Sequence, residues 1–532
     1  MFNYSRAIAA ATAAGALLVC GTTSAQQAMP EATGATTTFT INGFELTGDI
    51  PLPSADTTRI LTPFIGPGKT LDVLQKATSA LEAELKAKGY ALHRVSLPPQ
   101  EVGAKVTLNI VKFVIGTVTV EGLSAYTEAN IRASLPELRE GEAPNFKTLA
   151  VQTTIANENP GKQVKVTVKE SEEADKIDVK LVLKESTPWS FSASLANTGT
   201  ESSGRDRLSV VAGHANVLGL DHQASMAYTT SVERTNDVKQ LGLNYRIPLY
   251  RLGGVVGLSY TNADVVGNFG TFTSTGAGET YGVSYSHYLP PEGGRREFLL
   301  LGLDQKTFNA TKINGTTVPG QVDRGSNPVS LGYNLRVEED VAAWGYNAEL
   351  AANLGAGAGN TLSAYQAEDP RVRTVHWSAL RGGASYLAPF GTGWLWSARG
   401  QFQFSGDALI SGEQFGLGGV GSVRGAPDRA VVGDSGLLTS LELTTPELAP
   451  GLRLIGFAEG GWVSNNNTDL NPNKASTDRL ASVGLGLRYA AGALGLTAEW
   501  GRLVLGAATP LSGAAVPRVG DDKLHVSLTA RF

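Results

Sequence analysis

The stretch that decides the fold lies at residues 394–404 and reads WLWSARGQFQF. Its apolar side chains share one face of an extended chain: Trp394, Trp396, Ala398, Phe402 and Phe404. The opposite face is polar and carries Ser397, Arg399, Gln401 and Gln403. A segment of about ten residues with one apolar and one polar face is typical of a strand in an outer-membrane barrel.

The same alternation recurs along the C-terminal two-thirds of the chain. Residues 241–247 read LGLNYRI, and the last nine residues, 524–532, read LHVSLTARF and end on Phe532. Strands in lipid must pair with one another in a closed ring, because no water is present to bind their backbone groups. The residues from 187 to 532 suit about sixteen strands of roughly ten residues each, with their turns. We therefore predict a transmembrane antiparallel β-barrel, with Phe532 as its C-terminal barrel signal.

Composition is consistent with this fold and argues against other classes. Charged residues make up 17% of the 532 residues, against about 25% in a typical soluble domain. The net charge of −5 argues against a nucleic-acid binder, which is normally basic. No apolar run of 18 residues follows the N-terminal region. A soluble β-sandwich or β-repeat protein also alternates, but aromatic residues near the predicted strand ends, such as Trp189 and Trp462, favour a membrane barrel.

Residues 1–25 have the pattern of a secretory signal peptide. Arg6 precedes a mostly apolar stretch, and small residues up to Ala25 offer a cleavage site. Cys20 is the only cysteine, so the mature chain would contain neither a disulfide nor a thiolate. We expect residues 26–36 to form a short linker.

Two small α/β modules are predicted between the linker and the barrel, at residues 37–112 and 113–186. In the first, helical spacing over residues 70–88 is set by Leu71, Leu74, Leu81 and Leu85. Gly89 then stands where a helix C-terminus favours glycine. Strands are expected within 39–46, at 91–97 and at 105–111, in the order β-α-β-β.

The second module combines strands and helices in a similar way. We predict a strand at 114–121, helices at 127–135 and 147–157, and a hairpin of strands at 164–170 and 177–184. Lys and Glu residues along this hairpin are interpreted as its solvated face. An exposed strand edge on such a module can accept an extended peptide through backbone hydrogen bonds, which is one way to hold an unfolded polypeptide.

Local motifs extend this organisation to a known family. The runs LPPQEV at 97–102 and GTVTVEG at 116–122 join the two modules. Residues 413–436 read EQFGLGGVGSVRGAPDRAVVGDSG and contain a loop-tip motif, Val423-Arg424-Gly425. Downstream, FAEGG contains a partner-strand motif, Phe457, Glu459 and Gly461. With the modules and barrel, these motifs resemble the two-partner secretion transporters of ShlB, FhaC and HecB type (haemolysin secretion/activation proteins), within the BamA-like superfamily. The family's modules are called polypeptide-transport-associated (POTRA) modules.

The resemblance implies that the loop at 413–436 folds into the barrel and meets the partner-strand motif. Residue chemistry agrees, because the motif lies on the strand face opposite the apolar Leu454 and Trp462 and should point into the bore. The Arg424 guanidinium can then form two parallel bonds to the Glu459 carboxylate, a geometry that Lys cannot reproduce. An isolated Arg-Gly pair without these flanking motifs would be interpreted as a surface loop.

The function implied by this resemblance is export of a large secreted protein, of haemolysin or adhesin type, across the outer membrane of a Gram-negative bacterium. The POTRA modules would lie in the periplasm and capture the unfolded client, and the Arg424 loop would gate the pore. Outer-membrane lipid and periplasmic chaperones are the further partners expected. The polar strand faces predict four pore-lining residues: Asn244, Arg246, Arg399 and Gln401. The alternatives are an outer-membrane protein insertase and, less favoured because porins lack such modules, a passive solute porin.

No motif predicts catalysis, a cofactor, a metal or a nucleic-acid partner. A GxGxxG match at 416–421 is not followed by a helix, as a dinucleotide site requires. His214 and His222 lack a third ligand for zinc. Relatives often carry an N-terminal helix that plugs the pore, and the short interval between Ala25 and the first predicted strand predicts that this helix is missing.

Overall fold

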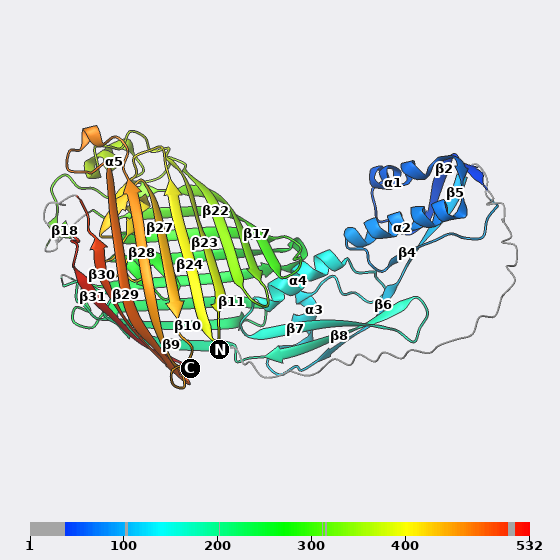
Figure 1. Ribbon diagram of the computed structural model, residues 1–532, viewed down its shortest axis with the longest axis horizontal. Coiled ribbons are helices and arrows are strands. Elements are labelled where there is room, and N and C mark those ends of the chain that lie inside the picture. The colour runs from blue at the N-terminus through cyan, green and yellow to red at the C-terminus, as the bar shows by residue number, and fades with distance from the viewer. Residues whose placement is uncertain (1–37, 102–104, 202, 311, 314–315, 509–515) are drawn as a thin grey trace, which may run out of the picture.

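A barrel and two small modules make up the computed structural model, which describes residues 38–101, 105–201, 203–310, 312–313, 316–508 and 516–532 (Figure 1). The predicted signal peptide and linker lie outside the described residues, as does the predicted absence of a plugging helix. Within the described ranges, no helix has both the length and the apolar character needed to cross a membrane.

The first module packs two helices against a small sheet. Its elements are β1 (Phe39–Ile41), β2 (Gly43–Gly48), α1 (Ser54–Leu61), β3 (Gly66–Lys69), α2 (Leu71–Ala87), β4 (His93–Ser96) and β5 (Lys105–Lys112). The sheet order is β2-β5-β4, with β2 parallel to β5, while β1 pairs separately with β3. Leu74, Leu81 and Leu85 of α2 are buried in the core, and Gly89 adopts a φ of +97° beyond its end.

The predicted β-α-β-β order omitted part of this module. Helix α1 was missed because it is short and contains two β-branched threonines, which weaken the helical signal. The first predicted strand divides at Asn42 into β1 and β2. The strand expected at 91–97 shortens to β4, and Leu71 is 57% exposed, so it lies outside the apolar face of α2.

The second module follows the predicted elements closely. They are β6 (Val114–Glu121), α3 (Glu128–Ser134), α4 (Phe146–Asn157), β7 (Lys162–Glu170) and β8 (Lys176–Glu185). The sheet order is β6-β8-β7, and the predicted hairpin is confirmed because β7 and β8 pair in antiparallel register. The outer strands of this sheet are therefore β6 and β7.

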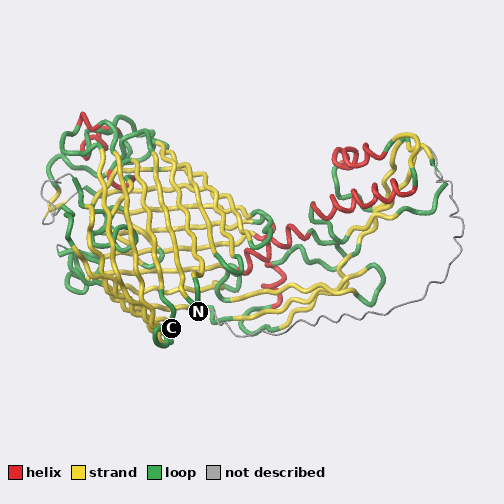
Figure 2. Tube along the Cα trace, viewed as in Figure 1, coloured by secondary structure: helices red, strands yellow, loops and turns green. Residues whose placement is uncertain are grey.

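Sixteen antiparallel strands within the described residues close into a barrel, which confirms the predicted fold class (Figure 2). They are β9 (Trp189–Ala196), β10 (Arg207–Val217), β11 (His222–Ser231), β12 (Lys239–Leu249), β13 (Gly254–Ala263), β16 (Gly278–Tyr288), β17 (Arg295–Phe308), the two-part strand β20 (Arg324–Ser326) with β21 (Pro328–Glu338), β22 (Ala343–Asn353), β23 (Ser378–Phe390), β24 (Trp394–Phe404), β27 (Ser435–Thr444), β28 (Leu452–Ser464), β29 (Thr477–Ala491), β30 (Leu494–Leu505) and β31 (Asp522–Arg531). Both segments of the two-part strand pair with β17.

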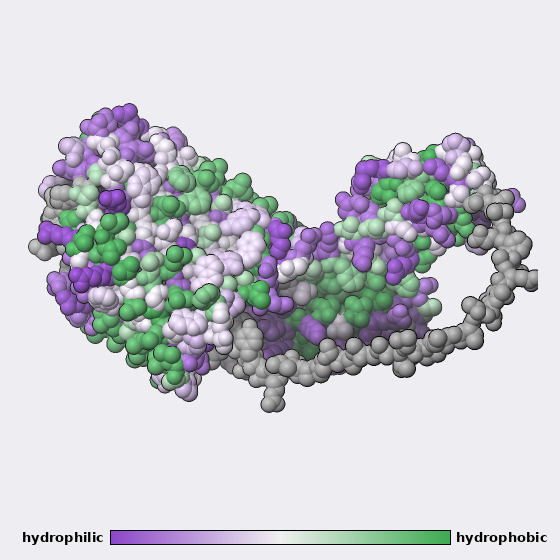
Figure 3. Space-filling view, in the orientation of Figure 1, coloured by the Kyte–Doolittle hydropathy of each residue, from purple (hydrophilic) through white to green (hydrophobic). Residues whose placement is uncertain are grey.

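Alternation along each strand places apolar side chains on the outer wall. In β24, Trp396 and Phe404 are 38% and 52% exposed, whereas Gln403 faces inward and is 4% exposed. The barrel exterior accordingly shows large apolar areas (Figure 3). An apolar outer wall and a polar bore are what a membrane-spanning barrel requires.

The last strand closes the barrel against the first. Residues Ser527–Arg531 of β31 pair with Ser192–Ala196 of β9. The backbone N–H of Phe532 donates to the Phe191 carbonyl at 2.9 Å, which extends this pairing to the terminal residue. The 81% exposed ring of Phe532 lies outside the protein core, so its role as a barrel signal stays a prediction.

A buried ion pair joins the second module to the barrel. Nζ of Lys162, on β7, lies 2.7 Å from Oδ2 of Asp221, in the turn between β10 and β11, and both side chains are buried. Asn159 Nδ2 donates to Asp221 Oδ1 at 2.5 Å, and the Tyr250 hydroxyl donates to Oδ2. Burial lowers the pKa of Lys162, while the charge of Asp221 opposes this shift.

Replacing Asp221 tests this joint. Asp221→Ala leaves a buried ammonium without its counter-ion, so we expect the joint to lose about 3–5 kcal/mol. Hydrogen exchange of the β7 and β8 amides, measured on the full chain in detergent, should show the loss. Glu121→Ala is the control, because it removes the more exposed Lys180–Glu121 pair at 2.7 Å, and such pairs contribute little. Equal protection in both variants would contradict the prediction.

Candidate functional site

A long loop between β24 and β27 enters the bore of the barrel. Its stems form a short hairpin of β25 (Phe415–Leu417) and β26 (Val431–Gly433). Gly418 and Gly419 follow β25 with φ of +112° and +93°, values that glycine adopts without strain. At the tip, Val423 and Arg424 are 0% and 3% exposed. We call residues 405–434 the inward loop.

Apolar packing and one glycine fit the inward loop against the wall. A buried cluster joins it to β27–β30: Leu417, Val423, Ala426, Val431, Leu438, Val463, Leu480 and Leu503. A Cβ at Gly461 would lie 2.3 Å from the Leu417 side chain. The last position of the partner-strand motif therefore has to be glycine for the loop to pack there.

Arg424 binds Glu459 of β28 with both its side chain and its backbone. Nε and Nη2 of Arg424 lie 2.9 and 2.7 Å from Oε1 of Glu459, and the Arg424 backbone N–H donates to Oε2 at 2.8 Å. This geometry differs from the expected pair of parallel bonds, because one oxygen receives both side-chain donors. Glu459 therefore fixes the backbone of the loop tip as well as the guanidinium.

Two further carboxylates that the sequence analysis missed also surround Arg424. Nη1 donates to Oε2 of Glu499 on β30 at 2.9 Å, and it lies 3.5 Å from Oε2 of Glu442 on β27. Arg488 on β29 bridges the same two residues, at 2.6 Å from Glu442 and 3.1 Å from Glu499. The sequence signal that could have found these residues was their position: each is a charged residue on the inward face of an alternating strand.

Every charge of this network has a partner. Ser440 and Ser482 donate to Glu459 at 3.3 Å each, and the Phe457 ring centroid lies 3.4 Å from Cζ of Arg424, a cation–π contact. Removing a buried member, such as Arg424 or Glu459, costs about 3–5 kcal/mol, although the complete network adds little net stability. Its physical effect is to hold the loop tip in one position. We call Arg424, Glu442, Glu459, Arg488 and Glu499 the tip network.

A cavity of about 1250 Å³ lies beside the inward loop inside the barrel. Arg399 and Gln401 line it together with members of the tip network, and Nη2 of Arg399 donates to the Gly421 carbonyl at 3.0 Å. The other two predicted pore residues do not line this cavity. Arg246 instead contacts Glu158, at the end of α4, at 3.0 Å, and Asn244 precedes it on the same face of β12.

A second hairpin also enters the bore, and the sequence analysis did not predict it. Strands β14 (Gly267–Phe269) and β15 (Phe272–Ser274) pair within the loop between β13 and β16. Phe269 and Phe272 pack in a cluster with Ala227 and Ala263 of the barrel wall. Gly242 of β12 leaves room for Phe272, since a Cβ there would lie 2.3 Å from its ring.

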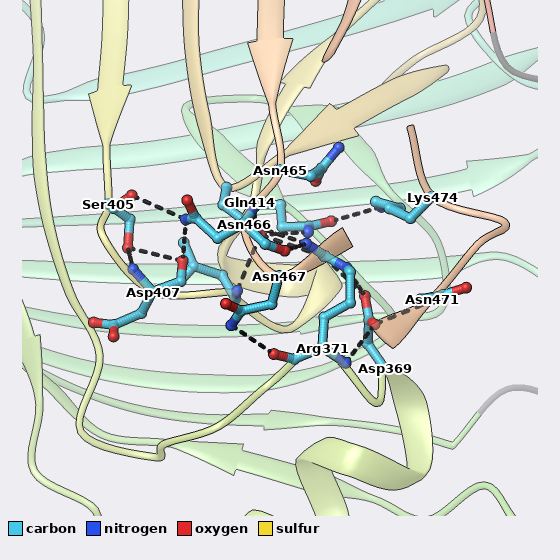
Figure 4. Close-up of polar contacts among 12 residues, drawn as sticks. Asp369, Arg371, Ser405, Asp407, Gln414, Asn465, Asn466, Asn467, Asn471 and Lys474 are labelled. Atoms are coloured by element: carbon cyan, nitrogen blue, oxygen red, sulfur yellow. Dashed lines mark hydrogen bonds and ion pairs between the residues drawn. The ribbon is translucent and has the colours of Figure 1, made fainter. Parts of the chain in front are cut away.

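The loops at the barrel end opposite the modules are joined by a buried charged cluster (Figure 4). Arg371 follows α5 (Leu362–Glu368) and is completely buried. Its Nη1 lies 2.8 Å from Asp434 and its Nη2 lies 2.8 Å from Asp369. Burial opposes the charge of Arg371, but hydrogen bonds and charge from these two carboxylates outweigh burial and raise its pKa.

Asp434 holds both stems of the inward loop. It is the residue before β27, and it accepts hydrogen bonds from the Leu409 N–H at 3.0 Å and from Gln414 Nε2 at 2.7 Å, both on the other stem. The N–H of Asn466, in the loop between β28 and β29, donates to it at 2.8 Å. The cluster around Arg371 and Asp434 therefore connects the inward loop to two neighbouring loops.

Metal ligation has no geometric support in the part of the chain that the structure describes. No group of three or more His, Cys, Asp or Glu side chains there could hold an ion. His214 and His222 lie near the module end of the barrel, and each contacts an aromatic side chain.

Comparison with protein families matches both parts of the chain. A family model described as haemolysin secretion/activation protein ShlB/FhaC/HecB matches residues 175–489. A second model, described as POTRA domain, ShlB-type, matches residues 39–112.

Individual relatives agree with these matches. The outer membrane transporter CdiB of Dickeya dadantii (strain 3937) is 24% identical over 446 residues, covering 81% of this chain and 77% of the relative. The solved structure of CdiB from Escherichia coli has a TM-score of 0.72 at 19% identity, covering 95% of this chain and 93% of its own. CdiB from Acinetobacter baumannii has a TM-score of 0.68 at 16% identity, covering 93% and 90%. At these identities the structural likeness shows the fold.

Arg371→Ala tests the cluster at the far end of the barrel. It leaves Asp434 and Asp369 buried without their counter-charge, so the surrounding loops should open more often. We expect an external protease to cleave within residues 354–377 at least about tenfold faster, the factor that corresponds to ~1.4 kcal/mol.

The matched control is Arg373→Ala, two residues away. Arg373 is exposed and lies 4.0 Å from Asp469, so its loss should leave cleavage unchanged. Mass mapping of the fragments gives the rates. Similar rates for the two variants would show that the buried cluster does not hold these loops closed.

Proposed function

Because this chain belongs to the haemolysin secretion/activation family ShlB/FhaC/HecB, we propose that it exports a cognate secreted protein across the outer membrane of a Gram-negative bacterium. The client would be a large polypeptide of haemolysin or adhesin type. The modules would lie in the periplasm and bind it unfolded, with periplasmic chaperones as further partners. Folding of the client at the cell surface would prevent its return and give the transport its direction.

The observation that carries this proposal is the inward loop, held across the bore by the tip network. In the proposed mechanism, the loop tip in this position would block the passage of a polypeptide. Arg424 makes all its charged contacts with strands β27, β28 and β30, so a shift of the tip must break them together. Such a group of coupled contacts favours two discrete positions over a continuum. The tip network would thus act as the gate of the pore.

Capture of the client would use the free edge of β7. The other outer strand of that sheet is β6, and side chains of the same module already bind its backbone. The Val118 N–H donates to Glu140 Oε1 at 3.2 Å, and the Val118 carbonyl accepts from Arg132 Nη2 at 2.7 Å. In the first module, the Val95 N–H of the outer strand β4 donates to Glu82 Oε1 at 2.8 Å. These side chains block strand addition at the edges of β6 and β4.

On β7, by contrast, the blocked region is short. Asn157 binds both backbone groups of Val164, at 2.7 and 3.0 Å, which shows that Val164 directs them away from β8. The strand period of two gives the same direction to the backbone groups of Val166 and Val168, which have no partner off the sheet among the described residues. A groove of about 560 Å³ lies at the blocked end of β7, where Asn157 of α4 and Val164 help to line it.

The surface around this edge suits an extended apolar segment. Val166 is partly buried and Val168 is 39% exposed, and Figure 3 shows an apolar surface on the second module, between the barrel and the first module. Backbone pairing would supply affinity with little demand on the client sequence, and alternate client side chains would meet this surface. The edge of β7 is therefore the site that we propose for client capture.

The alternative functions predict different behaviour. An insertase would release its clients sideways into lipid, and the short pairing between β31 and β9 is the contact that such a route would open. The family match favours secretion over this route. A porin would need an open bore, whereas the inward loop and the β14–β15 hairpin both enter this one.

Arg424→Ala tests the gate. Without the guanidinium, Glu442, Glu459 and Glu499 face one another with only Arg488 to balance them, so the loop tip should leave its position. We expect export of the co-expressed cognate client to fall at least about tenfold, with Arg424→Lys intermediate because it lacks the planar fork.

Secreted client in the medium is the readout, normalised to folded barrel by heat-modifiable gel mobility. Arg479→Ala, on the outer side of β29, is the control and should export normally. Unchanged export by Arg424→Ala at normal barrel abundance would contradict the proposed gating role of the tip network.

Val166→Pro tests the capture edge. Proline removes the N–H that would bind the client, while the N–H points away from β8 and is not needed for the sheet. We expect client binding and export to be lost, with the barrel and the β7–β8 pairing intact. Site-specific crosslinking between the second module and the client measures capture directly.

Val166→Thr is the matched control, since it keeps the N–H and the β-branched shape. It should capture and export the client normally. If Val166→Pro still crosslinks to the client as well as Val166→Thr does, the β7 edge is not the capture site, and export could still operate through another surface.

A further inference from the structure

A groove of about 670 Å³ lies on the outer wall of the barrel, across β9 to β13. Its floor is made of the small side chains of Ala212 and Ala224, which face outward at neighbouring positions of β10 and β11. Larger side chains form its walls: Trp189, Met226, Leu243, Tyr245, Leu258 and Tyr260. The groove is thus a hollow in the surface that faces the hydrocarbon of the membrane.

The shape and composition of this hollow suit an acyl chain. Met226 and Leu243 are 43% and 40% exposed beside the alanine floor, so an occupant would bury apolar surface on both sides. The surrounding lipid is as apolar as the groove, so an acyl chain gains no hydrophobic transfer energy by entering it, and close packing between the walls has to supply the preference. A chain held between aromatic walls would also be more ordered than the surrounding lipid.

One end of the groove is polar and has a defined hydrogen-bonding pattern. The Asn216 N–H donates to Nδ1 of His214 at 3.2 Å, so the neutral ring must carry its proton on Nε2. Trp189 packs edge-on against His214 at 4.5 Å between ring centroids. His214 Nε2–H and Trp189 Nε1–H are both donors at this end, and neither has a partner among the described residues. They suit an acceptor such as a phosphodiester oxygen.

The position of this polar end indicates which membrane leaflet the groove faces. His214 and Trp189 lie at the module end of their strands, near the turn between β10 and β11 that carries Asp221. With the modules in the periplasm, as the proposed function requires, this end lies at the periplasmic surface of the membrane. Trp and His side chains with an apolar body and a polar edge are suited to that boundary.

We propose that this groove is a binding site for one glycerophospholipid of the periplasmic leaflet. Its acyl chain lies along Ala212 and Ala224, and its phosphodiester accepts hydrogen bonds from His214 and Trp189. Leu218, in the same turn as Asp221, also lines the groove, so the bound lipid supports the turn that holds the second module.

Ala224→Phe fills the floor of the groove and tests the proposal. The full-length protein is purified from outer membranes in a mild detergent, and bound phospholipid is measured by native mass spectrometry and by phosphorus per folded barrel. We expect about one phospholipid per unmodified barrel and at least about a fivefold loss in the variant, because the added ring occupies the space of the acyl chain. The control is Ala458→Phe, an outward alanine of β28 far along the barrel wall, which should retain the lipid.

His214→Phe is a second, independent variant. It leaves the alanine floor open and removes one donor, so we expect roughly fivefold to tenfold lower occupancy, the effect of one lost hydrogen bond. If Ala224→Phe does not fold, this variant decides alone. Equal phospholipid in the unmodified and His214→Phe proteins, or lipopolysaccharide as the retained species, would overturn the proposal. Neither of these outcomes would change the expected export of the client, so failure of the lipid proposal can be distinguished from failure of the proposed function.

Discussion

Backbone hydrogen bonding in lipid is the constraint on which the rest of this structure depends. An unpaired N–H or C=O costs several kcal/mol in hydrocarbon, so each strand that crosses the membrane must pair on both sides. An open sheet always leaves two edges, and the pairing of β31 with β9 removes them. The terminal residue Phe532 takes part in this closure through its backbone. A ring of sixteen strands then leaves a wide bore. Its outer face is apolar because it contacts lipid, and alternation along each strand leaves the inner face free to be polar.

The contents of that bore follow from its width. Side chains alone do not fill it, and the chain folds two of its own loops inside. The inward loop is held at two separate places: at its stems by the cluster around Arg371 and Asp434, and at its tip by Arg424 and its carboxylates. Both places combine complete pairing with nearly complete burial. They add little to net stability but specify one arrangement, which is the property that a gate needs.

The proposed roles divide along the same physical lines. Where backbone groups are paired, as on β6 and β4, a strand edge is closed to partners, and where they are free, as at Val166, it can bind a peptide. On the outer wall, residue size determines where a lipid can bind. Alanines at 212 and 224 leave a hollow where larger side chains would give a smooth surface. Family membership supports the proposed export function, whereas the proposed surfaces rest on the residues of this chain.

Period-two alternation and the loop motifs were readable in the sequence because they are local or involve one pairing of opposite charges. They predicted the barrel, its strand number, most elements of the modules and the meeting of Arg424 with Glu459. Glu442, Arg488 and Glu499 could not be assigned to the same network, because the alternating pattern does not fix the register between consecutive strands, and register decides which inward side chains come together. The same holds for the β14–β15 hairpin in the bore, for Arg246 bound to Glu158 and for the groove outside. Local sequence determines which face of a strand is polar, but only strand register and tertiary packing decide which polar groups meet.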